Sequence, residues 1–115
     1  MEARAVARYV RMSPRKARQV VDAVRGLEVS KALNILHFTT KAAADPVEKT
    51  LRSAVANMLN NKDEGGKIDP ETLRVKEAFV DQGFAHRRFR AASMGRAMRM
   101  RRPSCHITIV ISTEE

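Results

Sequence analysis

The chain has no tryptophan, one tyrosine and four phenylalanines among its 115 residues, so aliphatic side chains must build most of its core. Its one cysteine cannot form an internal disulfide, which is typical of a protein from a reducing compartment. It also lacks the ~18 consecutive apolar residues of a membrane span and the apolar run of a secretory signal. These absences favour a single cytoplasmic domain, residues 1–115, with no membrane partner.

Acidic residues are missing altogether from residues 84–103, which hold seven arginines. Residues 1–26 carry a net charge of +5, whereas residues 27–83 carry −1. Thirteen of the fifteen arginines lie in the two basic blocks, and six of the seven lysines lie outside them. Arginine suits bidentate phosphate contact and stacking on bases. The segregation therefore favours a polyanionic partner over a merely solvated charged surface, which would mix the two signs.

Hydrophobic periodicity predicts an α+β fold in which three helices pack on a three-stranded antiparallel sheet. The first helix has Ser13 as N-cap, Pro14 at its first position and Gly26 as C-terminal cap. We expect caps at Ser30 for the second helix and at Asp45 for the third, the latter in a capping box with Glu48. The expected inward residues of the three helices are Ala17, Val20, Val21 and Val24; Ala32, Leu33, Ile35 and Leu36; and Val47, Leu51, Ala54, Val55 and Met58.

The strands are expected at residues 2–11, 72–83 and 105–113. The first alternates between a face of small residues and a basic face. A change of phase in the second predicts a bulge near Glu77, and turn-rich residues 60–71 precede it. The expected small-residue face consists of Ala3, Ala5, Ala7 and Tyr9, and the expected basic outer side of the first helix consists of Arg15, Arg18 and Arg25.

No arrangement of side chains indicates catalysis, a metal or a cofactor. The three histidines lack a metal-ligand partner three or four residues away. Cys105 and His106 are adjacent in a strand and therefore point to opposite faces, so they cannot form a nucleophile–base pair. The sequence predicts a protein that is not an enzyme.

Residues 84–103 join two strands that are expected to pair, yet they far exceed an ordinary hairpin loop. We expect a long basic β-hairpin arm extending from a globular part made of residues 1–83 and 104–115. Alternating arginine, apolar and small residues suit folded RNA, where guanidinium groups span phosphates and Phe89 or methionine packs on bases and sugars. Gly95 would permit a bend at the tip. DNA binding is less favoured because no recognition-helix motif is evident, and a disordered basic loop without a fixed partner is the alternative.

The stretches "ARYVRMSPRKARQVVDAVRG", "AVANMLNN", "VKEAFVDQG", "GRA" and "HITIVIS" follow one another in the chain. In this order they resemble the family of large-subunit ribosomal protein twenty-two, bacterial type. The resemblance implies a structural constituent of the ribosome that binds large-subunit ribosomal RNA and acts early in assembly. It places the globular part near the exit of the nascent-peptide tunnel and the hairpin in the tunnel wall near its constriction, close to large-subunit ribosomal protein four. No homo-oligomer is expected.

Charge and resemblance together give the predicted site. The RNA-binding residues are Arg4, Arg8, Arg11, Arg15, Lys16, Arg18, Arg25, Arg87, Arg88, Arg90, Arg96, Arg99, Arg101 and Arg102, and the hairpin tip is Ser93, Met94, Gly95, Arg96 and Ala97. Bacterial relatives often have Pro-Arg-Ala where this chain has Ala91, Ala92 and Ser93, so the resemblance says least about the tip. The alternatives are a free-standing RNA chaperone or nucleoid-like protein, and an interaction module for an acidic protein.

Overall fold

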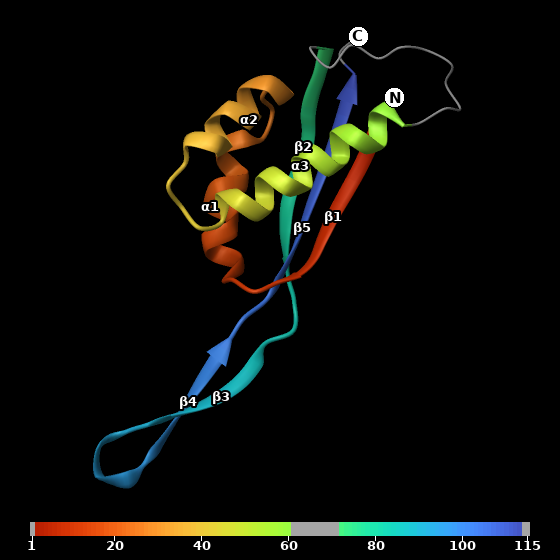
Figure 1. Ribbon diagram of the computed structural model, residues 1–115. Helices are drawn as coiled ribbons and strands as arrows, with labels where there is room; N and C mark the ends of the chain where they lie inside the picture. Colours follow the sequence, from red (N-terminus) through yellow and green to blue (C-terminus); the bar gives the residue numbers. More distant parts are fainter. Residues whose placement is uncertain (1, 61–71, 114–115) are drawn as a thin grey trace.

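The computed structural model describes residues 2–60 and 72–113, in which three helices lie against a sheet and a hairpin extends from it (Figure 1). The predicted α+β fold is confirmed. The turn-rich region expected at residues 60–71 lies, apart from Asn60, outside the described residues. None of the described helices is long and apolar enough to cross a membrane. The elements are β1 (Glu2–Val10), α1 (Pro14–Val24), α2 (Val29–Phe38), α3 (Ala44–Leu59), β2 (Leu73–Gln82), β3 (His86–Ala91), β4 (Ala97–Arg102) and β5 (Cys105–Thr113).

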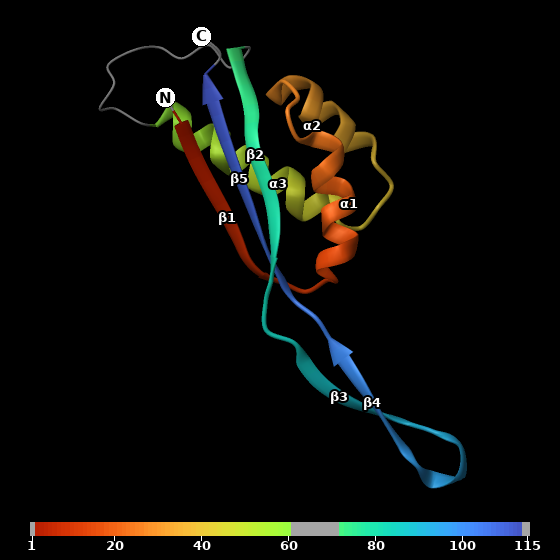
Figure 2. The same cartoon turned by 180° about the vertical axis from the view of Figure 1, so that it is seen from behind.

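The three-stranded sheet has the order β1-β5-β2, and both neighbours of β5 are antiparallel to it. The central strand carries Ile107, Ile109 and Ile111, all fully buried on the face that the helices cover. On the same face Ala5 of β1 is buried against α3, and its small size permits the close approach expected from the sequence. Figures 1 and 2 show α3 crossing the sheet on the β1 side, with α1 along β2. The helices therefore cover one face, and none of the described helices covers the other, where Thr108 and Val110 of the central strand are nevertheless buried.

Helix α1 forms as the sequence predicts, because a proline fixes its start and a glycine permits its end. Ser13 occupies the N-cap in an extended conformation, although its side chain makes no capping hydrogen bond. Gly26 has a φ of +81°, in the left-handed region that favours glycine. All four predicted inward residues of this helix are buried: Ala17, Val20, Val21 and Val24.

The other two helices begin earlier than predicted. The N-cap of α2 is Glu28 rather than Ser30, and the N-cap of α3 is Ala43 rather than Asp45. The capping box is therefore wrong: the Asp45 carboxylate lies in the first turn, 3.3 Å from the Lys49 ammonium. Each helix begins two residues earlier than predicted, and this extension packs one more apolar side chain, Val29 or Ala44, on the core.

Most residues predicted to face inward on α2 and α3 are buried. Two are only partly buried, and one is exposed. Val47, Leu51, Ala54 and Met58 are buried, and Leu33 and Val55 are partly buried against the core. Ile35 was predicted inward but is 41% exposed. Only a narrow stripe of α2 reaches the core, because α2 lies on the outer side of the helical layer, against α3.

Two irregularities shape the outer strands. The bulge predicted near Glu77 is confirmed by a register shift between Val75 and Glu77, which returns Ala78 and Val80 to the buried face. A second shift, between Ala7 and Val10, was not predicted. There Tyr9 has a φ of +57° and is 66% exposed, so its predicted place on the small-residue face is wrong. Its backbone N–H instead donates to Nδ1 of His106 at 3.1 Å.

The hairpin of β3 and β4 continues the β2–β5 pair beyond the sheet. Gln82 pairs with Cys105 and His86 with Arg102, so three residues on one strand oppose two on the other. This offset acts as a bulge and bends the strands. The chain measures 66 × 28 × 16 Å, and its radius of gyration of 17.4 Å exceeds the ~13 Å expected of a compact chain of this length. We call residues 84–103 the arm and the remainder the globular part.

Glycine is required where the arm begins. A Cβ atom on Gly83 would lie 2.7 Å from the Ser104 hydroxyl oxygen and 3.2 Å from Nε2 of His106. The Gly83 N–H donates to the Ser104 carbonyl at 2.9 Å, and the Ser104 hydroxyl donates to the Phe84 carbonyl. These bonds close the ladder across the offset.

Candidate nucleic-acid interface

The register of the arm gives it two chemically different faces. On one face Arg88 lies opposite Met100 and Arg90 opposite Met98. On the other, Phe89 lies opposite Arg99. Phe89 is 74% exposed and Met98 59%, so neither face is covered by the globular part. Both faces can thus offer guanidinium groups and apolar side chains to a partner.

Like charges face each other across the hairpin. Arg87 pairs directly with Arg101, an arrangement that destabilises an isolated sheet. The arm contains no acidic residue to relieve this repulsion. A two-stranded hairpin is itself only marginally stable in water. A polyanion removes the repulsion, and the arrangement is therefore suited to a nucleic-acid backbone.

The tip is a tight turn that exposes an apolar side chain. The Ala92 N–H donates to the Arg96 carbonyl at 2.7 Å, and Ser93–Gly95 form a single 3₁₀ turn. Gly95 has a φ of +72°, which confirms the expected bend. Met94 also adopts the left-handed region, with a φ of +62°, and is 94% exposed. Nothing in the sequence signals this conformation for a methionine, whose Cβ makes it unfavourable by about 1–2 kcal/mol.

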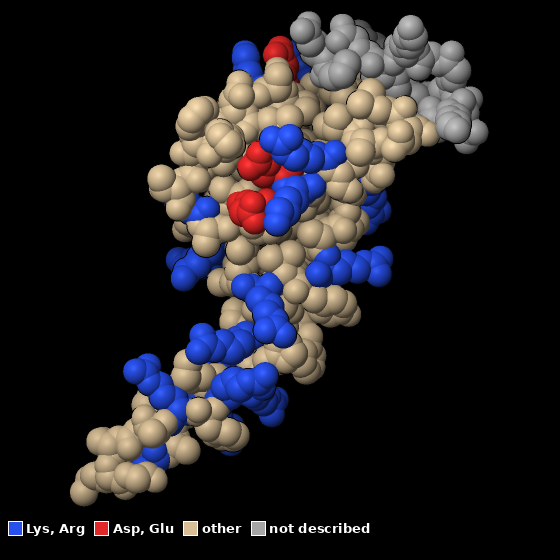
Figure 3. All heavy atoms as spheres, in the orientation of Figure 1, with Lys and Arg blue, Asp and Glu red and all other residues tan. Residues whose placement is uncertain are grey.

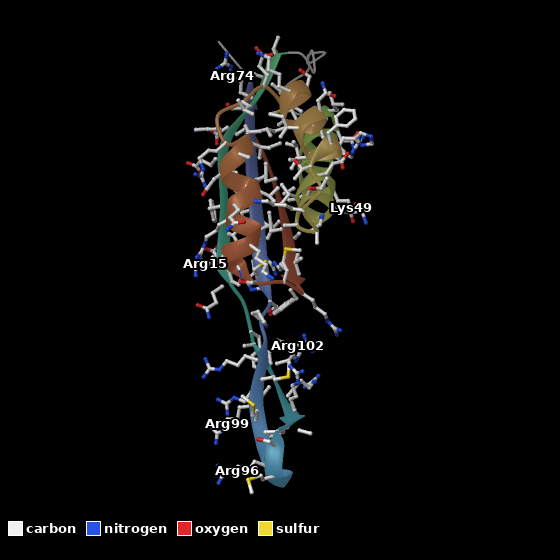
Figure 4. The ribbon with its side chains drawn as sticks, turned by 90° about the vertical axis from the view of Figure 1, so that its left-hand side faces the viewer. Arg15, Lys49, Arg74, Arg96, Arg99 and Arg102 are labelled. Atoms are coloured by element: carbon white, nitrogen blue, oxygen red, sulfur yellow. The ribbon has the colours of Figure 1, made fainter. Side chains whose placement is uncertain are left out.

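Positive charge continues from the arm onto the adjoining end of the globular part, while the visible carboxylates lie on the globular part (Figure 3). Arg96, Arg99 and Arg102 are spread along the arm, and Arg15 extends from the end of α1 nearest to it (Figure 4). Arg4 and Arg8 are exposed on β1 in alternation with the buried Ala5, on the uncovered side of the sheet. Predicted residues therefore extend from the arm onto the adjoining end of α1 and, separately, along the face of β1 that none of the described helices covers.

Four of these residues meet around a hollow where the arm joins α1, which we call the neck groove. Its volume is about 520 Å³. Arg11 and Lys16 approach from the globular part, and His86, Arg88 and Arg102 approach from the arm. The structure thus brings together charges that are separated by some seventy residues in the chain.

Two predicted RNA-binding residues have a role within the fold. Nε and Nη2 of Arg18 donate to the Val80 carbonyl at 3.2 and 3.0 Å. The same atoms of Arg25 donate to the Ala78 carbonyl at 3.0 and 2.6 Å, and Nη1 lies 2.9 Å from an Asp22 oxygen. These carbonyls belong to the free edge of β2, which the two guanidinium groups cover. The expectation that both residues simply form an outer basic side is corrected to that extent.

The expected separation of Cys105 from His106 is also seen. Cys105 is fully buried, and burial raises the pKa of its thiol. His106 lies on the other face, where its ring meets the Tyr9 ring edge-on with centroids 4.8 Å apart. Among residues 2–60 and 72–113, no three histidine, cysteine or carboxylate side chains gather as a metal site would require.

Comparison with known proteins decides the family. The family described as ribosomal protein L22p/L17e matches residues 5–112. The chain belongs to it. The large ribosomal subunit protein uL22 of Halothermothrix orenii is 51% identical over 115 residues, covering 100% of this chain and 98% of that protein. The proteins of the same name from Desulfitobacterium hafniense and Bifidobacterium longum are 52% and 47% identical, covering 96% and 100% of this chain and 93% and 98% of their own lengths.

These matches confirm the predicted family and, with it, the ribosomal identity and location of the chain. The family is one of structural ribosomal proteins rather than enzymes. The exposed basic arm and the neck groove are therefore features of a ribosomal protein.

Proposed function

We propose that this protein is a structural constituent of the large ribosomal subunit that binds large-subunit ribosomal RNA through the arm and the neck groove. The observation that carries the proposal is the pairing of arginines across an acid-free hairpin that packs on no core. Phosphates would neutralise that repulsion, while Phe89, Met94 and Met98, all exposed, would pack on bases or sugars. Nothing in this role requires a cofactor or a catalytic group.

The whole chain acts in this proposal as one RNA-binding domain with two parts. The globular part anchors the protein, and the arm enters the folded RNA. The length of 66 Å supports a reach well beyond the globular part. By resemblance to the family, we further propose that the protein acts early in subunit assembly, that its arm lines the nascent-peptide tunnel near the constriction, and that large-subunit ribosomal protein four is its neighbour there.

Salt-dependent binding tests the proposal. If about seven phosphates are neutralised, the observed affinity should fall with salt at a log–log slope of roughly −5 to −6. A large-subunit RNA fragment should stay bound at a salt concentration that removes unrelated RNA of equal length. Fluorescence anisotropy measures both. Equal loss of the two RNAs would favour a chaperone or nucleoid-like protein. Stronger binding of an acidic polypeptide than of RNA would favour an interaction module for an acidic protein.

Sedimentation provides an independent measurement. The protein should remain with large subunits after a high-salt wash, because the arm would be enclosed by folded RNA. Release of the protein into the supernatant, together with binding to any RNA in the first assay, would overturn the structural role.

A further inference from the structure

The neck groove is lined by cations from both parts of the molecule. Arg11 and Lys16 belong to the globular part, whereas Arg88 and Arg102 belong to the arm. All four are exposed, and no carboxylate among the described residues pairs with any of them. The lining contains no acidic side chain at all. Each part therefore repels the other until an anion lies between them.

The start of α1 adds to this positive field. Ser13, the N-cap, lines the groove, and its side chain makes no capping hydrogen bond, although its backbone carbonyl accepts from the Ala17 N–H. The first turn of α1 carries no acidic residue. A helix N-terminus of this kind favours an anion. It does so here together with the four cations that already converge on the groove.

A second hollow continues the groove away from the arm. Its volume is about 640 Å³, and Arg11, Ser13 and Lys16 line both hollows. It ends at Lys41, whose ammonium donates to Oε1 of Gln19 at 3.1 Å. Its lining also lacks acidic residues. The positive track is thus extended, which suits a run of phosphates better than one small anion.

The arm has few other attachments to the globular part. Its strands pack chiefly on each other, and Figure 4 shows them well clear of the helices. The Gly83–Ser104 hydrogen bond and the offset between Gln82 and His86 lie at its base. Such an irregular two-stranded connection resists bending weakly compared with a packed element.

We propose that the neck groove binds a phosphodiester backbone of RNA, and that this binding sets the direction of the arm relative to the globular part. The inference rests on the proposed function and adds a specific site and a mechanical role to it. Successive phosphates of one strand, held by Lys16 on one side and Arg102 on the other, replace repulsion across the neck groove by attraction to a shared polyanion. RNA thereby selects one arm direction from those the free protein samples.

Distances between two spin labels test the mechanical role. Ala56→Cys on α3 and Ser93→Cys at the tip provide exposed attachment sites, while native Cys105 is fully buried and does not compete for label. The free protein should give a broad distance distribution by double electron–electron resonance. The large-subunit RNA fragment retained at high salt should narrow it. A distribution that is narrow without RNA would overturn the proposal.

Matched charge variants test the site. Lys16→Gln with Arg102→Gln removes one cation from each side of the groove, whereas Lys49→Gln with Arg52→Gln removes the same charge from the outer surface of α3. Lys49 and Arg52 are themselves exposed, and each makes one i,i+4 pair within α3: Lys49 with the exposed Asp45, and Arg52 with the partly buried Glu48. Circular dichroism melting should show both variants folded, since such surface changes alter stability little.

The groove variant should keep a broad distance distribution at saturating RNA, and its log–log salt slope should be shallower by about 1.4 to 1.8. The distance distribution of the α3 variant should narrow on RNA binding as that of the wild type does, and its log–log salt slope should be unchanged. If the distance distribution of the groove variant narrowed to the wild-type width, the inference about the neck groove would be overturned, while the proposed RNA binding would stand. Failure of the wild type to prefer the ribosomal fragment would instead overturn the proposed function.

Two further probes identify the ligand. Inorganic phosphate should leave the wild-type distribution broad, because a single anion cannot span the track; narrowing by phosphate alone would overturn the need for a phosphodiester chain. Poly-glutamate should also leave it broad, and narrowing by poly-glutamate would assign the groove to an acidic protein instead.

Discussion

The globular part and the arm both carry arginine in excess, and they use it in different ways. Arg18 of α1 and Arg25, the C-cap of α1, turn toward the edge of β2 and donate to its carbonyls at 2.6 to 3.2 Å. On the arm, Arg87 and Arg101 lie opposite each other with no acid nearby. In the globular part arginine completes the fold, whereas in the arm it opposes the fold. An arginine thus stabilises the fold where carbonyl acceptors lie within its reach, and is available to bind a partner where they do not.

The largest expected effect concerns the core that only the globular part has. Val20→Asp places a carboxylate at a position that is 3% exposed, with no described partner. An unpaired buried charge should cost more than about 4 kcal/mol of unfolding free energy. Circular dichroism should show no cooperative melting. A folded Val20→Asp protein would mean that the inward side chains of α1 are not part of the core. The globular part would then not differ from the arm in depending on such a core.

The second prediction separates two arginines on one helix. Arg18→Met should lower the unfolding free energy by about 1 to 2 kcal/mol, because the Val80 carbonyl at the edge of β2 loses its donor. Arg15→Met, which is exposed and donates to no described acceptor, is the matched control and should change it by less than about 0.5 kcal/mol. Urea unfolding of both variants measures the difference. Equal effects would show that the edge contact contributes nothing.

The third prediction removes the arm. Replacing residues 87–101 by an Asn-Gly turn should change the unfolding free energy of the globular part by no more than about 0.5 kcal/mol, because the segment packs on no core residue. The repulsion among its arginines is removed with it. The melting temperature should stay equal or rise slightly. Loss of the fold would show that the arm packs on its own domain.

The same replacement should have a large effect on function. The shortened protein should still join large subunits through the globular part, but more weakly. Ribosome profiling of cells that carry it should show altered stalling of nascent chains, with peptidyl transfer intact. Unaltered stalling would contradict the proposed place of the arm in the tunnel.

The smallest expected effect concerns an ion pair on the uncovered face of the sheet. The Lys76 ammonium donates to the Glu2 carboxylate and lowers the pKa of that carboxyl, while Glu2 raises the pKa of Lys76. A lowered pKa stabilises the fold above the ordinary pKa of glutamate, and the contribution is lost as the pH falls through the lowered value. Wild type should therefore melt slightly above Glu2→Gln at pH 7, and this difference in melting temperature should shrink as the pH falls below the ordinary pKa of glutamate. A difference that does not shrink on acidification would point to another cause, and Lys76→Gln should reproduce the pH 7 result.

Much of the fold and of the basic character could be predicted from local patterns. The α1 stripe, the bulge near Glu77 and the central strand with Ile107, Ile109 and Ile111 each follow from a period that the chain itself displays. The basic arm was equally evident, because twenty residues without an acid have no way to neutralise themselves. Helix starts were less predictable: Ser30 and Asp45 are good caps, but burial of Val29 and Ala44 outweighed them.

The sequence by itself determined the identity of the elements, their inward faces and the location of the charge, since these depend on residues near one another in the chain. Only the tertiary structure decided which charges act together. Arg18 meets the Val80 carbonyl sixty-two residues away, and Tyr9 turns outward because His106 accepts its N–H. The neck groove likewise exists only because α1 begins beside the base of the arm. Hydrogen bonds and electrostatic fields depend on distance in space, and a linear pattern does not contain that distance.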